Sequence, residues 1–570
     1  MKKSSITWKK WQLLTNNFSE KFENFTDFFL HSRKISDSEK FFNWKYPEDL
    51  RDWKNLKDIW KWVERVISAI EKWERIIIFW DYDCDWIPWT TILVDSLQQL
   101  WAKVSYRIPN RENDWYWLKN YFLDEFKEKD VKLVITVDNW ISSIEEAEYA
   151  KKLWIDLIIT DHHEVQDWKI PDCIAVINPQ RPDCEYWFWW ICWAVVAWKF
   201  AIEIWKELKK DKLNWENWVN ENIRDKHIEL AWLSTVADIM PLVDENRIIV
   251  KEALKKIKNT ENPWIKAILK EMQFKPEWNL DSTFFWFKLW PRINATWRMH
   301  EWIFWVQLLL WNTWHAPFIE KLNTERKEIV SWILRKVEQD LKNKAELEEN
   351  WKINELIILN DPNWKSWIIW LIAWKITENL TLPSIVLQDK WDFLVASCRA
   401  PEWFNIFELL SNFKDLFSHF WWHEQACWFS IPKENFEKFE KEAKKLWKEI
   451  LKKSPLKNFL TSDFELTEKF LNLNFLDEMK KLEPFWKWNE SPKFLIKNVS
   501  PEIFLVWKDK NHLQLKFFNN RAIFFNSWKF YEKLKIATSR WWTCDIILTL
   551  NENFFMGKRQ LGVQVVDVAI

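Results

Sequence analysis

Glycine is what this chain lacks most. It contains 2 glycines in 570 residues, although average usage would give roughly 40 in a chain of this length. Glycine adopts left-handed backbone without steric cost, so its near absence would exclude most tight turns. The chain also contains 52 tryptophans, and the two counts together come close to the expected number of glycines. Because some bacterial lineages read the codon UGA as glycine, we infer that many printed tryptophans are glycines in the natural protein.

The positions of the tryptophans favour the same interpretation. Pairs stand at 189–190, 421–422 and 541–542, and single tryptophans, Trp80 and Trp140, follow strand-like runs where a turn would call for glycine. The alternative is a truly tryptophan-rich chain, which could hardly make tight turns. The tryptophans that we expect to be genuine are Trp364, Trp8 and Trp11.

The chain also lacks paired cysteines, long apolar runs and an excess of charge. Its seven cysteines are odd in number and form no C-x-x-C pair, which argues against a disulfide framework or a zinc ribbon and favours a reducing cytoplasm. No apolar run approaches the roughly 18 residues of a membrane span, and the basic N-terminus lacks an apolar signal region. We therefore expect a soluble, unexported protein without a membrane segment.

Charge alone does not select a partner. The chain has 83 basic and 84 acidic side chains, for a net charge of −1. Without a global positive field, binding to nucleic acid would need a local groove.

A chain of this length is expected to form two to four domains. Between residues 50 and 245, short β-rich runs alternate with amphipathic helical runs, which predicts an α/β fold with a parallel sheet. A charged stretch at 319–350 predicts a long connecting helix. The predicted parts are an N-terminal segment (1–49), a catalytic α/β domain (50–310), a connecting helix (311–350), a second α/β domain (351–452) and an OB-type β-barrel (455–570).

Acidic and histidine residues follow three strand-like runs. DYDCDW places Asp81, Asp83 and Asp85 after the first run, TVDNW places Asp138 after the second, and TDHHEV places Asp161, His162 and His163 after the third. A further carboxylate, Asp238, follows an apolar helical stretch. In parallel sheets ligands bind beyond the carboxyl ends of the strands, where the residues that follow the three strand-like runs fall.

One D-x-D or one histidine pair is weak evidence, since acidic turns and surface imidazoles are common. Three such strand ends together favour a metal site. Mixed carboxylate and imidazole ligands suit Mn²⁺, with Mg²⁺ as the second choice. Two such ions can polarise water toward phosphorus, which predicts hydrolysis of a phosphodiester or a phosphoanhydride.

With Trp86, Trp89 and Trp140 read as glycine, the first two motifs become DYDCDGIPGTT and TVDNGISS, and together with TDHHEV they resemble the DHH phosphoesterase superfamily. Further strings resemble its RecJ family of single-strand-specific 5′-to-3′ exonucleases over roughly residues 50 to 570. They are IPNR, WPRINATWRMH, SCRAPEWFN, FWWHEQACWF and LEPFWKWNE.

The resemblance implies roles for individual residues. Five would bind two Mn²⁺ or Mg²⁺ ions: Asp83, Asp85, Asp138 as the bridge, His162 and Asp238. Asp81 and Asp161 would orient these ligands, and His163 would contact the scissile phosphate. The residues implied to hold the DNA and its 5′-phosphate are Arg111, Arg292, Asn294, Arg298, Ser397, Arg399 and His423. Cys84, inside the first motif, is expected to pack rather than react.

Two other functions stay open on the sequence. One is a nano-RNA or cyclic-dinucleotide phosphodiesterase of the same superfamily, although those chains are shorter and lack the barrel. The other is a catalytically dead DNA-binding scaffold, although every implied ligand position is filled here. We expect a cytoplasmic monomer that acts on single-stranded DNA in repair or recombination, and the barrel is a candidate docking surface for a single-strand-binding protein or a helicase.

The recoding is testable in the gene. We expect the codons at Trp86 and Trp89 to be UGA, and peptide masses from the natural host to show glycine at both positions. A UGG codon at either position, with tryptophan in the peptide, would contradict the recoding there.

Overall fold

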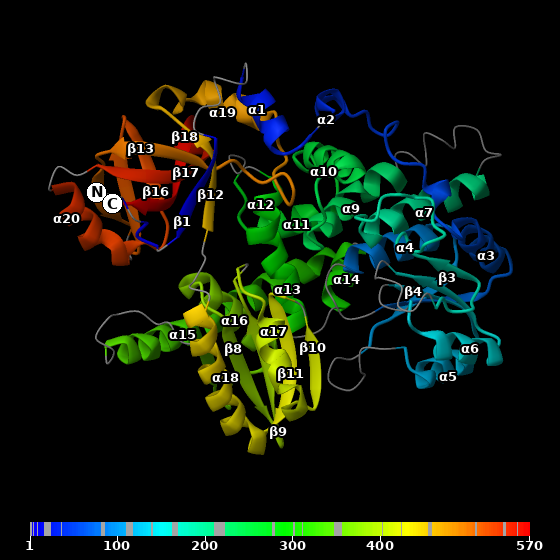
Figure 1. The fold of residues 1–570 in the computed structure, drawn as a ribbon. Helices are drawn as coiled ribbons and strands as arrows, with labels where there is room; N and C mark the ends of the chain where they lie inside the picture. The colour runs from blue at the N-terminus through cyan, green and yellow to red at the C-terminus, as the bar shows by residue number, and fades with distance from the viewer. Residues whose placement is uncertain are drawn as a thin grey trace.

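The computed structural model describes most of the 570 residues. The residues outside its description are 1–2, 4, 8, 16–23, 36, 81–85, 110–117, 138–140, 162–168, 210–222, 276–279, 300–302, 311, 347–355, 402, 423, 454–458, 508–509, 540–542 and 556. Three sheets organise the described chain, one in each of three parts that can be seen in Figure 1.

The first sheet has five parallel strands in the order β3-β2-β4-β5-β6. Its strands are β2 (Arg75–Trp80), β3 (Lys103–Arg107), β4 (Val131–Val137), β5 (Asp156–Thr160) and β6 (Ala175–Ile177). Ile76 and Ile78 of β2 enter one hydrophobic core, whereas Ile77 and Phe79 enter another. Both faces are therefore buried, which explains the continuous apolar run of β2.

Helices cover the two faces of this sheet. One core is shared with α3 (Ile59–Glu71), α4 (Trp86–Gln99), α7 (Trp193–Lys209) and α9 (Asp225–Ala237). The opposite core is shared with α5 (Asn120–Glu128) and α6 (Ile144–Lys152). The predicted doubly wound α/β domain is confirmed.

Further helices lead from this domain to the second sheet. They are α10 (Asp244–Ile257), α11 (Pro263–Glu271), α13 (Trp290–Met299), α14 (Ile303–Leu309) and α15 (Ala316–Glu346). The 31-residue α15 is the predicted connecting helix, and it packs on α13, α11 and α16 (Ser366–Leu380). No helix in the described chain is long and apolar enough to cross a membrane.

The second sheet is mixed and has the order β10-β11-β9-β8-β7. Its strands are β7 (Ile357–Asn360), β8 (Ser384–Lys390), β9 (Phe393–Arg399), β10 (His419–Trp422) and β11 (Ala426–Pro432). Helices α16, α17 (Ile406–Leu410) and α18 (Lys433–Lys453) share its core, which includes Trp364 and Ile372. The sheet forms the yellow lower part of Figure 1.

The third sheet has eight strands in the order β1-β12-β13-β17-β18-β16-β15-β14. The strands after the first are β12 (Phe459–Glu465), β13 (Phe494–Val499), β14 (Glu502–Val506), β15 (His512–Phe517), β16 (Asn520–Phe524), β17 (Cys544–Phe555) and β18 (Lys558–Ala569). Helices α19 (Leu473–Lys480) and α20 (Tyr531–Ser539) accompany them.

The N-terminal segment completes this third part, which the sequence did not reveal. Strand β1 (Lys10–Thr15) pairs in parallel with β12, and Ile6 donates its backbone N–H to Val568. Phe25 of α1 (Phe25–Ser32) packs against Phe464 and Phe494. Figure 1 accordingly shows the two chain ends close together, with blue β1 beside β12.

A buried arginine joins the third part to the first. Arg247 of α10 is 1% exposed and donates to the carbonyl oxygens of Leu482, Glu483, Pro484 and Phe41 at 2.9–3.4 Å. Burial lowers its pKa to about 9. Carbonyl oxygens thus satisfy a guanidinium that pairs with no carboxylate in the described chain, and α10 is fixed to the segment that leads into the third sheet.

Left-handed backbone falls on tryptophan unusually often. Nineteen described non-glycine residues have positive φ, and seven of them are tryptophans. Trp73, Trp101 and Trp154 each follow a helix, and their N–H groups and those of the next residues close the helix ends as glycine usually does. Trp101 and Trp154 are 82% and 81% exposed, so their indoles make little contact. These positions support the recoding of tryptophan for glycine.

Substitution separates the two kinds of tryptophan. W101G should raise the free energy of unfolding by about 1 kcal/mol, because it removes left-handed strain from an exposed residue. W364G should lower it by about 3–5 kcal/mol, because Trp364 is 8% exposed within the second core. Urea unfolding measures both changes. A loss of stability in W101G comparable to that in W364G would contradict the assignment of glycine at position 101.

Candidate active site

The predicted ligands follow three neighbouring strands that end in register. In the parallel pairing of β4 with its neighbours, Trp80 of β2 lies beside Val137, and Val137 lies beside Thr160 of β5. The next residues in sequence are Asp81, Asp138 and Asp161. Parallel neighbours lie about 4.8 Å apart, so the three motifs leave the sheet at one edge.

Most of the predicted ligands lie outside the described residues. They are Asp81, Asp83, Asp85, Asp138, His162 and His163, and the predicted DNA contacts Arg111 and His423 lie outside them as well. Arg298 lies in α13, but its side chain is not described. Within the described chain no group of three or more histidines, cysteines or acidic residues could hold a metal ion. The ligand set therefore stays a prediction.

Asp161 is fully buried and joins two of the motifs. Its Oδ2 accepts a hydrogen bond from the backbone N–H of Ile141 at 2.8 Å, and its own N–H donates to Ile177 of β6 at 2.9 Å. Ile141 follows the TVDNW motif in sequence. The carboxylate therefore ties the segment after β4 to the end of β5, which suits a residue that orients ligands.

Asp238 ends helix α9 and is partly exposed. Its N–H donates to Ser234, and the next residue, Ile239, has a φ of 51° and is 43% exposed. A left-handed β-branched residue is strained, and such strain persists where the surrounding structure enforces it. The N–H of Met240 then donates to the carbonyl of Thr235, so backbone hydrogen bonds close the helix end next to Asp238.

Cys192 lies near Asp238 but is not a metal ligand candidate. Its thiol is fully buried, and its Sγ lies 3.2 Å from the Thr235 hydroxyl. Burial raises its pKa to about 12, and the negative charge of Asp238 acts in the same direction. The thiol is therefore protonated at neutral pH, and it packs in the hydrophobic core.

A buried polar contact that the sequence did not reveal joins two helices of the site. Nε2 of His227 in α9 lies 3.0 Å from Oδ2 of Asp95 in α4, and Lys226 donates to the same carboxylate at 2.7 Å. Burial alone would raise the pKa of Asp95, but His227 and Lys226 hold it well below its usual range. Burial lowers the pKa of His227. The pair positions α9, whose end carries Asp238, against α4, which follows Asp85.

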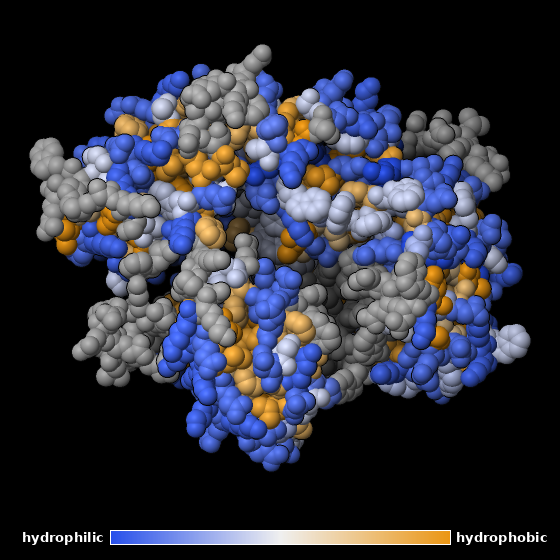
Figure 2. Space-filling view, viewed as in Figure 1, coloured by the Kyte–Doolittle hydropathy of each residue, from blue (hydrophilic) through white to orange (hydrophobic). Residues whose placement is uncertain are grey.

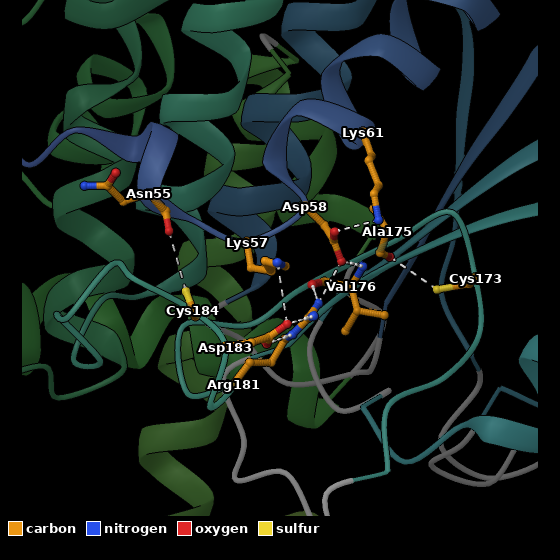
Figure 3. A network of polar contacts seen from close by, with 10 residues as sticks. All are labelled: Asn55, Lys57, Asp58, Lys61, Cys173, Ala175, Val176, Arg181, Asp183 and Cys184. Atoms are coloured by element: carbon orange, nitrogen blue, oxygen red, sulfur yellow. Dashed lines mark hydrogen bonds and ion pairs between the residues drawn. The ribbon is translucent and has the colours of Figure 1, made fainter.

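A second network fixes the segment after β6, as Figure 3 shows. Arg181 donates to Asp58 at 2.7 Å, to Asp183 at 2.7 and 2.9 Å, and to the carbonyl of Val176. Asp58 precedes α3 and also pairs with Lys61. These contacts hold the last strand of the sheet against α3, and they are structural.

Two predicted DNA contacts of α13 are buried. Arg292 is 6% exposed and donates to both carboxylate oxygens of Glu320 in α15 and to the carbonyl of Lys288. Asn294 is 8% exposed, and its Oδ1 is buried without a hydrogen-bond donor among the described residues. Arg292 is thus paired with Glu320 of α15 in this structure, whereas Oδ1 of Asn294 could still accept a hydrogen bond.

Ser397 and Arg399 lie on β9 two residues apart, so both belong to the same face of the second sheet. Arg399 donates to the carbonyl of Cys398 at 2.7 Å and lies over the ring of Trp370 in α16. Burial lowers its pKa. It pairs with no carboxylate among the ion pairs of the described chain, so its guanidinium suits an incoming anion.

These residues come from parts that meet at the centre of the molecule. Figure 1 shows α13 and α14 between the first sheet on the right and the second sheet below. The face in Figure 2 is hollowed where the three parts approach one another.

Two family models match this chain. The DHH family, N-terminal domain, matches residues 75–229, and the RecJ OB domain matches residues 462–567.

The chain carries a DHH domain and a RecJ OB domain, and it is similar to RecJ proteins.

Similar RecJ proteins come from several bacteria. The chain is 27% identical to the single-stranded-DNA-specific exonuclease RecJ of Bacillus subtilis over 85% of its own length and 60% of that relative. It is 29% identical to the protein of the same name from Salmonella typhimurium over 78% of each. The chain therefore spans less than two thirds of the Bacillus protein.

The fold of this chain is similar to that of a RecJ protein of known structure. The crystal structure of RecJ in complex with Mn²⁺ from Thermus thermophilus matches 98% of this chain and 79% of its own, with a TM-score of 0.77 at 22% identity. The predicted architecture of a DHH domain followed by an OB domain is confirmed.

Asp161 offers a test of the site's framework. D161A should lower the free energy of unfolding by about 1–3 kcal/mol, because the buried N–H of Ile141 loses its acceptor. D161N keeps an acceptor oxygen of the same size and should lose less. Equal unfolding midpoints in urea for the two variants would show that this hydrogen bond does not hold the segment.

Proposed function

We propose that this chain is a metal-dependent exonuclease that degrades single-stranded DNA from its 5′ end. The in-register ends of β2, β4 and β5 carry the proposal, because they bring the starting points of three acidic motifs to one edge of a parallel sheet. The names of the relatives supply the substrate, which the fold alone does not specify.

The proposed metal ligands are Asp83, Asp85, Asp138, His162 and Asp238, for two Mn²⁺ or Mg²⁺ ions. Carboxylate oxygen and imidazole nitrogen suit these cations, and the one described ligand, Asp238, is a partly exposed carboxylate at a rigid helix end. Bound ions of this kind activate water and stabilise charge at phosphorus.

Other side chains around the proposed metal centre are proposed to orient the metal ligands and to bind the scissile phosphate. Asp161 positions the segment after β4 through Ile141, and Asp81 is proposed to act similarly on the first motif. His163 is proposed to contact the scissile phosphate. Such positioning groups reduce the freedom of the reacting atoms before the reaction begins.

The strand and its end are proposed to lie along basic groups of the two α/β parts. Ser397 and Arg399 on β9 are proposed to bind the 5′-phosphate, together with Arg111, because a guanidinium can bind phosphate with two parallel hydrogen bonds. Arg292, Asn294, Arg298 and His423 are proposed to contact the strand. An end-binding pocket of this kind would set the direction of digestion.

The cellular setting is part of the same proposal. The cysteines of the described chain are unpaired, which suits a reducing cytoplasm. A monomer would suffice, since one chain supplies both α/β parts. The OB domain is the proposed docking surface for a single-strand-binding protein or a helicase.

The proposal is tested with protein expressed from a gene in which the suspect codons specify glycine. D138A should reduce Mn²⁺-dependent digestion of 5′-phosphorylated single strands by roughly a thousandfold or more, since several kcal/mol of stabilisation at phosphorus are lost. Release of label from either end of the oligonucleotide measures rate and direction.

The matched control is D124A, because Asp124 is an exposed carboxylate of α5 that bonds only Tyr149 in the described chain. It should keep the full rate. Nuclease activity retained in D138A would refute the two-metal assignment, and activity on dinucleotides but not on long strands would indicate a short-substrate phosphodiesterase instead.

A further inference from the structure

Helix α15 carries a basic cluster where it packs on α13. The cluster consists of Arg326 and Lys327 of α15 and Arg292 of α13, with Lys288 close by. The charge of Arg292 acts on Arg326, and the charges of Arg292, Arg326 and Lys288 all act on Lys327. Four cationic side chains therefore lie within electrostatic reach of one another.

Among the described residues, Glu320 is the carboxylate that acts on Arg292 and Lys327. Glu320 acts on Lys327, but both of its oxygens are engaged by Arg292, with Nη2 at 2.9 Å from Oε1. Nη2 of Arg326 donates a hydrogen bond to Oδ1 of Asn323 on the same helix, at 3.0 Å. Glu320 thus neutralises one arginine, and the positive charge of Arg326 is left over.

Two donors at Arg326 are buried and lack acceptors within the described part of the chain. They are Nε of Arg326 itself and Nδ2 of Asn323, whose side chain is fully buried. Because Oδ1 of the same amide accepts from Arg326, Nδ2 lies beside the guanidinium. Unpaired buried donors cost free energy unless a further group accepts from them.

Arg247 shows how the chain treats an arginine that serves structure alone. It too is buried without a carboxylate among the described residues, but four backbone carbonyls accept from its nitrogens. At Arg326, burial lowers the pKa to about 10, with repulsion from Arg292 as the second cause. The described surroundings of Arg326 therefore lack the acceptor that the surroundings of Arg247 provide.

We propose that Arg326, Asn323 and Lys327 form a phosphate-binding site on the connecting helix, which takes an internal phosphodiester of the DNA strand. The inference rests on the proposed function for the identity of the strand. A phosphate supplies both the negative charge and the acceptor oxygens that the cluster lacks. The site adjoins α13, which carries Asn294 and Arg298, and so the connecting helix takes part in binding rather than only joining two domains.

The first test compares R326Q with R335Q, which alters an exposed arginine farther along the same helix whose Nε bonds Ser331. Binding of a 5′-phosphorylated oligothymidylate is measured by fluorescence anisotropy with EDTA, so that no digestion occurs. R326Q should raise Kd about tenfold and reduce the slope of log Kd against log salt by about 0.7. R335Q should match wild type. Wild-type Kd and slope in R326Q would overturn the site.

The second test uses the unaltered chain, so it does not depend on whether R326Q folds. Phenylglyoxal modifies arginine, and peptide mass spectrometry follows Arg326 and Arg335 separately. Oligothymidylate and inorganic phosphate should each slow modification of Arg326 at least several-fold and leave Arg335 unchanged. Equal modification of Arg326 with and without both anions would overturn the site.

The two proposals fail in different ways. If the protein digests single strands but the anions do not protect Arg326, the proposed function stands and the phosphate site on α15 is refuted. If the protein does not digest single strands but phosphate protects Arg326, the proposed function is refuted and the anion site stands.

Discussion

The parallel pairing of β4 with β2 on one side and β5 on the other is the constraint on which the proposed chemistry depends. It places Trp80, Val137 and Thr160 in one row, so three motifs that are distant in sequence leave the sheet together. Side chains on both faces of β2 are buried, so a shift of this register would move core residues as well as motif residues. The stability of the sheet and the geometry of its edge are therefore linked.

Buried polar contacts then fix what lies around that edge. Asp161 ties two strand ends, the Asp95–His227 pair ties α4 to α9, and Arg247 ties α10 to the segment before β13. Each contact satisfies groups that would otherwise be costly to bury. The basic cluster of α15 differs, because the described chain supplies too few acceptor oxygens and too little negative charge for its donors and cations.

The sequence predicted those parts of the fold that local pattern controls. The alternation of apolar and amphipathic runs between residues 50 and 245 predicted the parallel sheet, and the charged run predicted α15. It did not predict that β1 joins the last sheet, because pairing between Lys10 and Phe459 leaves no local trace. The same holds for the site. Strand-end carboxylates can be recognised in sequence, whereas the engagement of Arg292 by Glu320 depends on how two helices pack.

The tryptophan problem shows how composition and backbone geometry inform each other. The low count of glycine beside the high count of tryptophan suggested that glycine codons are read as tryptophan in this sequence. The left-handed backbone at Trp101 and Trp154 supports this interpretation, because glycine adopts that conformation without strain. Taken as tryptophan, Trp86 and Trp140 would place bulky rings within the motifs themselves.

The shared sheet of the chain ends has a consequence for synthesis. Ser5 pairs with Ala569, and β1 needs β12 as its neighbour, so β1 is synthesised more than 400 residues before the strand with which it pairs (about 450 from Lys10 to Phe459). The catalytic part, whose strands are close in sequence, can fold long before. The third part therefore closes after the first, and a chain that ended before β12 would leave β1 as an unpaired, aggregation-prone strand.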